Sequence, residues 1–370
     1  MCFATKGHGD IEEERILALL EPLQPSLYPF DRARKLRTAV GLAKAVRTQR
    51  PRLVVMEGTG MAGGLTLLAL DAILGVPFVF SSGDAVGPYL HLRSRIAGVL
   101  GGLYERLLCK RCAGFIGWTP YLVGRGLTLG APRAMTAPGF TRGHISEGAR
   151  ARIRERLGIA EDAIAFGLAG SLRWNDRIGY AYGAELVQAV RRVERADVVV
   201  CVIGDGDGRA RLEEMAGDDL GTRVLLPGRV PPAEVPDHLA ALDVGSLSQS
   251  VDQVGAFRYT TKLAEYFAAS LPVVSGEVPL AYDLDEGGMW VLPGSAPWSP
   301  TYVAALARLL ERVTREEVEA KREAVRARTS EPFDLGEQQR RIAAFLQSVL
   351  AERGGDAQVP GWRGEGASRS

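Results

Sequence analysis

Cysteine and histidine are scarce in this sequence, which has four of each among 370 residues. Four cysteines in a chain of this length do not make a disulfide framework. Cys109 and Cys112 have the spacing of a zinc-binding pair, but no second such pair and no nearby histidine would complete the site. We therefore expect no metal site and no redox chemistry.

Long apolar runs are also missing, since the longest are too short and too often interrupted by polar residues to span a bilayer. The amino-terminal residues lack the basic, apolar and small-residue order of a signal peptide. The composition, with 46% hydrophobic and 24% charged residues, is that of a globular protein with room for two domains. We expect the chain to stay in the cytoplasm.

Acidic residues are outnumbered in the first part of the chain. Residues 1–140 contain 17 Lys or Arg and 10 Asp or Glu, a formal charge of +7, whereas the whole chain has a formal charge of +1. A basic amino-terminal part could favour an anionic acceptor or peripheral contact with the inner face of an anionic membrane. An arginine-rich composition would produce a similar imbalance by itself. We expect no nucleic-acid partner.

One basic segment, residues 92–112, has the pattern of an amphipathic helix. Its apolar residues lie along one face, and it also contains Arg93, Arg95, Arg106, Lys110 and Arg111. Such a helix can lie on a membrane. More often it packs against its own sheet, and packing is the interpretation that we favour.

Strands and helices alternate along the first 140 residues. Strand patterns at residues 1–5, 52–57 and 75–80 each run into a glycine-containing loop and then a helix, which predicts a doubly wound parallel sheet. The first strand is short for an opening strand, as if a few residues were missing upstream. Ligands of such sheets bind outside the carboxyl ends of the strands. The candidate acceptor-side or phosphate-loop residues at these ends are Gly7, His8, Gly9, Glu57, Asp84 and His91.

For Glu57, Asp84 and His91, a core or capping role is the common alternative to ligand binding.

Residues 258–276, RYTTKLAEYFAASLPVVSG, combine the start of an amphipathic helix with a buried strand. Thr260 and Thr261 are favourable N-cap residues for the helix. The free amides and the dipole at the helix start, together with Lys262, suit a phosphate. Glu265 lies three residues later on the same helical face, so a phosphate and a hydroxyl could be held together. The alternative is a capped surface helix in which the two charges pair in solvent.

The run KLAEYFAASLPVV, which begins at Lys262, resembles the carboxy-terminal signature of retaining glycosyltransferases of the GT-B fold, family-4 type, also called glycosyl transferases group 1. Other elements appear in the order of that family, namely a strand at 163–169, its loop at 170–177, a glycine turn at 204–208 and a strand at 241–247. The resemblance covers residues 163–276. It implies an α/β fold of two Rossmann-like, doubly wound parallel-sheet domains that face each other across a cleft.

This fold class divides the chain into parts. We expect an acceptor-side domain at residues 1–140, a polar linker at 141–160 and a nucleotide-sugar-binding domain at 161–330. A helix at residues 331–353 is expected to cross back to the first domain. Residues 354–370 are rich in Gly, Ser and Arg without an apolar period, which predicts disorder.

The resemblance implies transfer of a sugar from a nucleoside diphosphate sugar to an acceptor hydroxyl, with retention at the anomeric carbon and without a metal or cofactor. UDP is favoured over GDP or ADP only because it is the commonest donor nucleotide among relatives. The acceptor is left open among a glycan, a lipid-linked molecule and a small molecule.

The implied catalytic residues are Arg173, Arg177, Lys262, Glu265 and Asp84. The cations and the helix amides would stabilise the charge that develops on the departing β-phosphate. Glu265 would hold the ribose, as the glutamate of the family does. The implied donor-binding residues are Gly170, Ser171, Gly204, Asp205, Gly206, Arg229, Val230, Tyr259, Thr260, Thr261, Lys262 and Glu265.

Three positions depart from the family pattern. Ser171 stands where the family has an arginine, and Arg173 and Arg177 could compensate because guanidinium groups bind phosphate bidentately. Phe257 stands where a second glutamate is usual, and Gly83 where a histidine usually precedes the aspartate. The candidate substitutes are Asp252 or Gln253 for the glutamate, and His8 or His91 for the histidine.

These departures leave two alternatives open. One is an enzyme of different chemistry on the same fold, such as a nucleotide-sugar epimerase or a phosphorylase. The other is a non-catalytic protein that binds a nucleotide-sugar.

Overall fold

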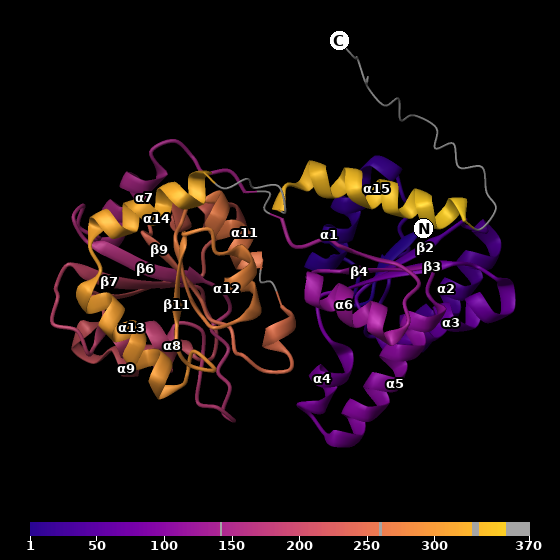
Figure 1. Cartoon of the computed structure of the whole chain (residues 1–370), viewed down its shortest axis with the longest axis horizontal. Helices are drawn as coiled ribbons and strands as arrows, with labels where there is room; N and C mark the ends of the chain where they lie inside the picture. The colour runs from indigo at the N-terminus through magenta and orange to yellow at the C-terminus, as the bar shows by residue number, and fades with distance from the viewer. Residues whose placement is uncertain (141–142, 259–260, 328–332, 353–370) are drawn as a thin grey trace, which may run out of the picture. The chain divides into compact units, whose positions relative to one another are not determined.

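The computed structural model describes residues 1–140, 143–258, 261–327 and 333–352. The chain forms two units (Figure 1). Unit 1 comprises Met1–Pro138 and Asp334–Ser370, and unit 2 comprises Gly139–Phe333. Unit 1 is therefore made of two separate stretches of sequence, whereas unit 2 is one continuous stretch.

The sheet of unit 1 is parallel, and its strands follow one another in chain order. The strands are β1 (Cys2–Ala4), β2 (Val54–Glu57), β3 (Phe78–Ser82), β4 (Gly114–Gly117) and β5 (Ala134–Thr136). On the outer side of β1, the Cys2 amide donates to the Ser26 carbonyl at 2.8 Å and the Tyr28 amide donates to the Cys2 carbonyl at 2.9 Å. The strand order of this unit has no reversal within the described residues.

The helices of unit 1 are α1 (Ile11–Leu20), α2 (Lys35–Gln49), α3 (Met61–Leu74), α4 (Val86–His91), α5 (Arg95–Arg111), α6 (Pro120–Leu129) and α15 (Leu335–Ala351). A short 3-10 helix, η1 (Glu21–Leu23), follows α1. Helix α15 lies along α1, where the Gln339 side chain donates to the Ala18 carbonyl at 2.8 Å. A Cβ atom at Gly114 would lie 2.8 Å from the Phe345 ring, so α15 also covers the start of β4. Helix α15, the last helix among the described residues, therefore completes unit 1.

The sheet of unit 2 is also parallel, but its strand order reverses. The strands are β6 (Ile164–Ala169), β7 (Val198–Ile203), β8 (Val224–Gly228), β9 (Val244–Leu247), β10 (Val273–Gly276) and β11 (Met289–Leu292). They lie in the order β11-β10-β9-β6-β7-β8, so the chain turns from one side of β6 to the other between β8 and β9. The loops after β6 and β9 leave the sheet side by side at this switch point, which is where open α/β sheets bind ligands.

The helices of unit 2 are α7 (Ala149–Leu157), α8 (Ala184–Val190), α9 (Arg209–Ala216), α10 (Val235–Ala240), α11 (Thr261–Ala268), α12 (Pro279–Leu284), α13 (Pro300–Arg312) and α14 (Arg315–Ala327). Helix α7 lies within the segment expected to be a linker. It packs against α10, and Asp237 on α10 accepts hydrogen bonds from the Ser146 amide at 2.7 Å and from Arg152 at 2.8 Å. In the structure this segment is part of unit 2.

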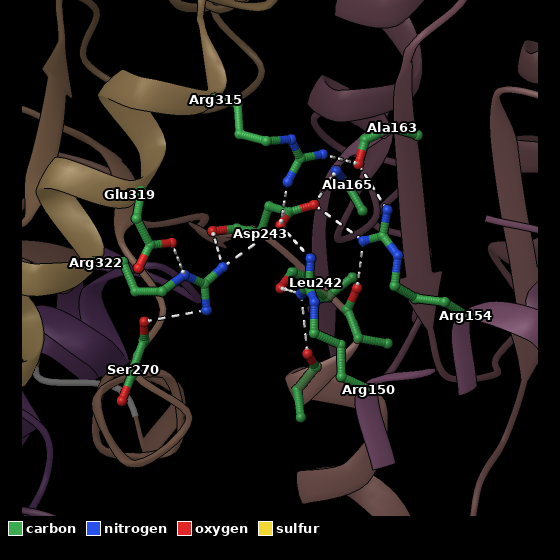
Figure 2. Close-up of polar contacts among 12 residues, drawn as sticks. Arg150, Arg154, Ala163, Ala165, Leu242, Asp243, Ser270, Arg315, Glu319 and Arg322 are labelled. Atoms are coloured by element: carbon green, nitrogen blue, oxygen red, sulfur yellow. Dashed lines mark hydrogen bonds and ion pairs between the residues drawn. The ribbon is translucent and has the colours of Figure 1, made fainter. Parts of the chain in front are cut away.

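A buried carboxylate, Asp243, joins the two strands at the switch point. The Asp243 amide donates to the Ala165 carbonyl at 2.8 Å, and the Asp243 carboxylate accepts from the Ala165 amide at 2.8 Å, which ties β9 to β6 at their amino ends. Figure 2 shows four arginines around this carboxylate, with nitrogen-to-oxygen distances of 2.6 Å for Arg150, 3.0 Å for Arg154, 3.7 Å for Arg315 and 3.5 Å for Arg322. Asp243 therefore also anchors α7 and α14.

Burial alone would raise the pKa of Asp243. The charges of Arg150 and Arg154 and the hydrogen bond from the Ala165 amide outweigh it, so the pKa is lowered.

We expect Asp243→Ala to lower the free energy of unfolding by about 3–5 kcal/mol, because it leaves buried arginines without their counter-charge. Glu213→Ala is the control, since Glu213 forms a partly exposed pair with Arg209 at 2.7 Å and its loss should cost less than about 1 kcal/mol. Urea unfolding of both variants measures the difference. Equal losses of unfolding free energy in the two variants would show that the ion cluster around Asp243 stabilises the fold no more than the Arg209–Glu213 pair does.

The stabilisation that Asp243 provides should also depend on pH. Because the folded pKa of Asp243 is lowered, its contribution is present above the unfolded pKa of about 3.9 and is lost as the pH falls through the folded pKa. The difference in unfolding free energy between wild type and Asp243→Ala should be constant from about pH 5 to 8 and shrink below about pH 4. A constant difference down to about pH 3 would contradict this assignment.

Candidate functional site

Lys262, on the first turn of α11, lies over the loop that follows β6. A Cβ atom at Gly170 would lie 3.2 Å from Lys262 Cε and 3.3 Å from Nζ. The Nζ atom is 4.5 Å from the centre of the Tyr182 ring, at the far end of the same loop. Since α11 follows β9 in the chain, Lys262 bridges the two segments that leave the switch point of the sheet.

Two carboxylates influence the pKa of Lys262. Burial lowers the pKa of Lys262, and the negative charges of Glu265 and Glu185 oppose that shift. Burial raises the pKa of Glu265, and Lys262 opposes that shift in turn. Both side chains are only half-buried, so a ligand can reach them. The structure thus places a cation and a carboxylate one helical turn apart at the switch point.

Glu185, in the first turn of α8, is a member of the site that the sequence interpretation missed. Its side chain is fully buried and accepts hydrogen bonds from Tyr180 Oη at 2.8 Å, from Ser246 Oγ at 3.3 Å and from Ser248 Oγ. Burial raises its pKa. The signal in the sequence was a single carboxylate at the start of the otherwise uncharged helix AELVQAV.

The glycine turn after β7 packs against the loop after β6. A Cβ atom at Gly204 would overlap the Gly170 carbonyl oxygen, and one at Gly206 would lie 2.6 Å from the Leu172 carbonyl. The Leu172 amide donates to the Asp205 carbonyl at 3.0 Å. Close contact between two backbones therefore explains these glycines without a ligand, and the expected donor role of Gly204, Asp205 and Gly206 stays a prediction.

Other predicted donor residues lie at the same edge of the sheet. Ser171, Arg173 and Arg177 are exposed on the loop after β6, where a bridge between Asn175 and Tyr180 closes a turn. Arg229 is exposed and Val230 is half-buried, both directly after β8. Thr261 begins α11. Tyr259 and Thr260 lie outside the described residues.

In unit 1, Glu57 belongs to a closed network in the core. It is fully buried and accepts hydrogen bonds from Arg15 at 2.6 Å, from Ser81 at 2.9 Å and from the Trp118 indole at 3.1 Å. Arg15 in turn donates to the Ala137 carbonyl at 2.5 Å. The structure places Glu57 in the core, and its expected acceptor-side role stays a prediction.

Gly83 is the position at which the resemblance implies a histidine. A Cβ atom there would lie 2.7 Å from the Trp118 ring, so the indole leaves no space for a side chain. Asp84, the next residue, is half-buried in a turn in which its amide donates to Ser82 Oγ at 3.2 Å. His91 is exposed at the end of α4, and its Cβ would contact a Cβ at Gly98.

The first loop of unit 1 forms two polar pairs with the start of α1. His8 Nδ1 is 2.8 Å from Glu13 Oε1, which also accepts from the Gly9 amide at 3.0 Å. Lys6 Nζ is 2.6 Å from Glu12 Oε1, while Glu12 Oε2 is buried and has no hydrogen-bond partner among the described residues. Burial raises the pKa of Glu12, against the effect of Lys6. The sequence interpretation named Gly7, His8 and Gly9 here but missed Lys6 and Glu12.

No metal site accompanies these groups within the described residues, where no cluster of three His, Cys, Asp or Glu side chains could hold an ion.

Comparison with known proteins identifies the part of the chain that carries Lys262 and Glu265. Residues 164–312 match the family described as glycosyl transferases group 1. The match covers most of the second unit, and the chain is a glycosyltransferase. No curated protein matches the glycosyltransferase by sequence.

Solved structures share the fold of the whole glycosyltransferase. HepE of Anabaena in complex with UDP is 16% identical and superposes with a TM-score of 0.73, covering 94% of this chain and 99% of that chain. Sucrose-phosphate synthase from Thermosynechococcus elongatus is 15% identical, with a TM-score of 0.60 over 87% of this chain and 81% of that chain. A UDP-forming trehalose-phosphate synthase from Burkholderia xenovorans is 15% identical, with a TM-score of 0.58 over 86% and 80%. The predicted GT-B class is confirmed.

We expect Gly204→Ala to destabilise the glycosyltransferase by about 3 kcal/mol or more, because the new Cβ would overlap Gly170 and the backbone φ of +143° disfavours a side chain. Gly179→Ala is the control, since Gly179 has a φ of +63° with nothing within 4 Å and should cost about 1–2 kcal/mol. Urea unfolding distinguishes them. If both variants lost the same amount, the contact between the loops after β6 and β7 would not be the constraint on Gly204.

Proposed function

We propose that this glycosyltransferase moves a sugar from a nucleoside diphosphate sugar, with UDP as the favoured nucleotide, to an acceptor hydroxyl with retention at the anomeric carbon. The observation that carries the proposal is the position of Lys262 over Gly170, with Glu265 one turn further along α11. The nucleotide-sugar is a substrate, so the proposal includes no cofactor and no metal. It assigns the reaction to the cytoplasm.

The diphosphate of the donor would bind between the loop after β6 and the start of α11. Lys262 supplies a cation there, and the free amides of the first turn of α11 supply hydrogen-bond donors and the positive end of the helix dipole. Arg173 and Arg177 are exposed on the facing loop and would add guanidinium groups. Together these groups would stabilise the charge on the β-phosphate as it leaves.

Glu265 would accept hydrogen bonds from the ribose of the same nucleotide, because its carboxylate lies on the face of α11 that carries Lys262. Uridine nucleotides are favoured because HepE is described in complex with UDP and with UDP-glucose, and the trehalose-phosphate synthase as UDP-forming. These ligands belong to those proteins and support the choice of UDP here.

In the proposed reaction, the bond between the anomeric carbon and the β-phosphate oxygen breaks, and a bond from the acceptor oxygen to that carbon forms on the same face of the sugar. The acceptor proton passes to the departing phosphate, so no metal-bound base is needed. Asp84, at the carboxyl end of β3, is the proposed acceptor-side residue of unit 1.

We expect Lys262→Ala and Glu265→Ala each to weaken UDP binding by about 1.5–3 kcal/mol, the range for losing a hydrogen bond to a charged group. Arg326→Ala is the control, because Arg326 is exposed on α14 and pairs with Glu319 at 3.0 Å, away from the switch point. Titration calorimetry with UDP, GDP, ADP and TDP, with and without EDTA, measures affinity, nucleotide preference and metal dependence. Unchanged UDP affinity in correctly folded variants would mean that Lys262 and Glu265 belong to an ordinary surface helix and do not bind the donor.

Incubation with the sugar of the preferred nucleotide separates this function from its alternatives. Slow hydrolysis of the donor supports a transferase, whereas isomerisation of the sugar without an acceptor would indicate an epimerase. Tight binding without any turnover across a panel of acceptors would favour a non-catalytic binding protein.

The charge of Glu185 should appear in the pH dependence of UDP binding. Affinity should fall as the pH rises through the pKa of Lys262, which Glu185 helps to raise. In Glu185→Gln the fall should begin at a lower pH, and in Lys262→Ala it should vanish. Calorimetry from about pH 7 to 10 tests this, given that burial has already lowered this pKa from the usual value of about 10.4. The same pH profile in wild type and Glu185→Gln would exclude electrostatic coupling between the two residues.

A further inference from the structure

Helix α5 of unit 1 is apolar on the face that points away from the protein. It packs through Gly98, Gly101, Tyr104 and Leu108, and the two glycines lie against α4. The opposite face nevertheless carries aliphatic side chains that are between 46% and 74% exposed, namely Ile96, Val99, Leu100, Leu103 and Leu107. Their spacing of three and four residues places them in one stripe along the helix.

A second exposed apolar surface lies between α2 and α3. The two helices line a groove of about 660 Å³ whose walls are mostly aliphatic. Leu36 and Val40 on α2 and Leu65, Ile73 and Leu74 on α3 line it and are between 45% and 84% exposed. Monomeric proteins rarely expose apolar patches of this kind without a partner.

The two apolar surfaces are adjacent, since α5 runs beside α3 and α3 beside α2 (Figure 1). Arg111 at the end of α5 pairs with Asp71 on α3 at 2.7 Å. Leu107 lies one turn before Arg111 on α5, and Leu74, which lines the groove, lies three residues after Asp71 on α3, so the ion pair brings the ends of the two apolar surfaces together. We call the exposed side chains of α2, α3 and α5 the α2–α3–α5 face.

The charge of this face is almost entirely positive. Its three helices contain eight basic residues, all exposed: Lys35, Arg37, Lys44, Arg47, Arg95, Arg106, Lys110 and Arg111. They contain two acidic residues, Asp71 and Glu105, which pair with Arg111 and Arg125, each at 2.7 Å. The face therefore offers aliphatic side chains surrounded by an excess of positive charge.

We propose that the α2–α3–α5 face is a peripheral docking site for an anionic lipid bilayer. Aliphatic side chains would enter the interface while lysine and arginine side chains reach the headgroups. No helix among the described residues has both the length and the apolar character to cross a membrane, so the contact lies on the surface. The proposal rests on unit 1 alone and does not depend on the function proposed for the donor site.

A second copy of the chain fits this face less well. A two-fold dimer would bring the same patch of both copies together. Eight exposed basic residues on each side would then face eight of the same sign, and like charges across an interface are unfavourable. Anionic headgroups supply the opposite charge.

Flotation of the full chain with vesicles of phosphatidylcholine, with and without one quarter phosphatidylglycerol, tests the proposal. We expect binding to the anionic vesicles that falls as salt is raised from about 0.1 to 0.5 M, and weak binding to the neutral ones. Val99→Gln with Leu103→Gln should lower the partition coefficient at least about tenfold. Leu220→Gln with Tyr282→Gln, at exposed positions of unit 2, is the matched control and should bind as wild type does.

Charge reversal tests the electrostatic part separately. Arg106→Glu with Lys110→Glu should lower binding to anionic vesicles more than about twentyfold, since each basic residue near such a surface contributes about a factor of five. The control is Arg211→Glu with Arg326→Glu, two exposed positions of unit 2. Circular dichroism and thermal unfolding verify that every variant is folded.

Two outcomes would overturn the proposal. One is wild-type binding that is absent, or equal for both vesicles and unaffected by changes on α5. The other is a dimer by analytical ultracentrifugation that Val99→Gln with Leu103→Gln converts to a monomer without vesicle binding in either form, which would make the face a self-association interface.

Discussion

The buried carboxylate of Asp243 fixes the pairing on which the functional end of unit 2 depends. It ties β9 to β6 at their amino ends and gathers arginines from α7 and α14 around the same point. These two strands flank the reversal in strand order. Because they are held in register at one end, the loops at the other end emerge next to each other, and Lys262 can lie over Gly170. The ion cluster and the site thus occupy opposite ends of one strand pair.

The parts of the fold that could be predicted from the sequence are those set by local pattern. Alternating strands and helices in the first 140 residues indicated one parallel sheet, and the family resemblance implied the second. The short spacing between Lys262 and Glu265 put both on one face of a helix that the structure also contains. Glu185 was missed because its partners Ser246 and Ser248 lie more than 60 residues away in sequence. Glu57 was ambiguous for a similar reason, since its partner Arg15 lies 42 residues before it.

Helix α5 shows another limit of pattern reading. An amphipathic pattern predicts that one face packs, and small residues are usually not counted as part of that face. Here Gly98 and Gly101 allow close approach to α4, so the packed face is built partly of glycine, and Leu100, Leu103 and Leu107 remain exposed. Gly83 is a comparable case, because the Trp118 ring that fills its space comes from a different strand end. At Gly98, Gly101 and Gly83 alike, the residue that contacts the glycine comes from another segment of the chain, so the sequence around the glycine does not reveal it.

The division of unit 1 into two stretches bears on how the chain is made. The ribosome synthesises α1 and β4 early, but α15, which covers both, comes only after all of unit 2. At about 5–20 residues per second, the nascent chain exposes that apolar surface for a delay on the order of ten seconds or more. Unit 2 is one continuous stretch of sequence and can fold as soon as it has left the ribosome. The domain translated first is therefore the one completed last, and its uncovered surface is open to chaperones throughout that interval.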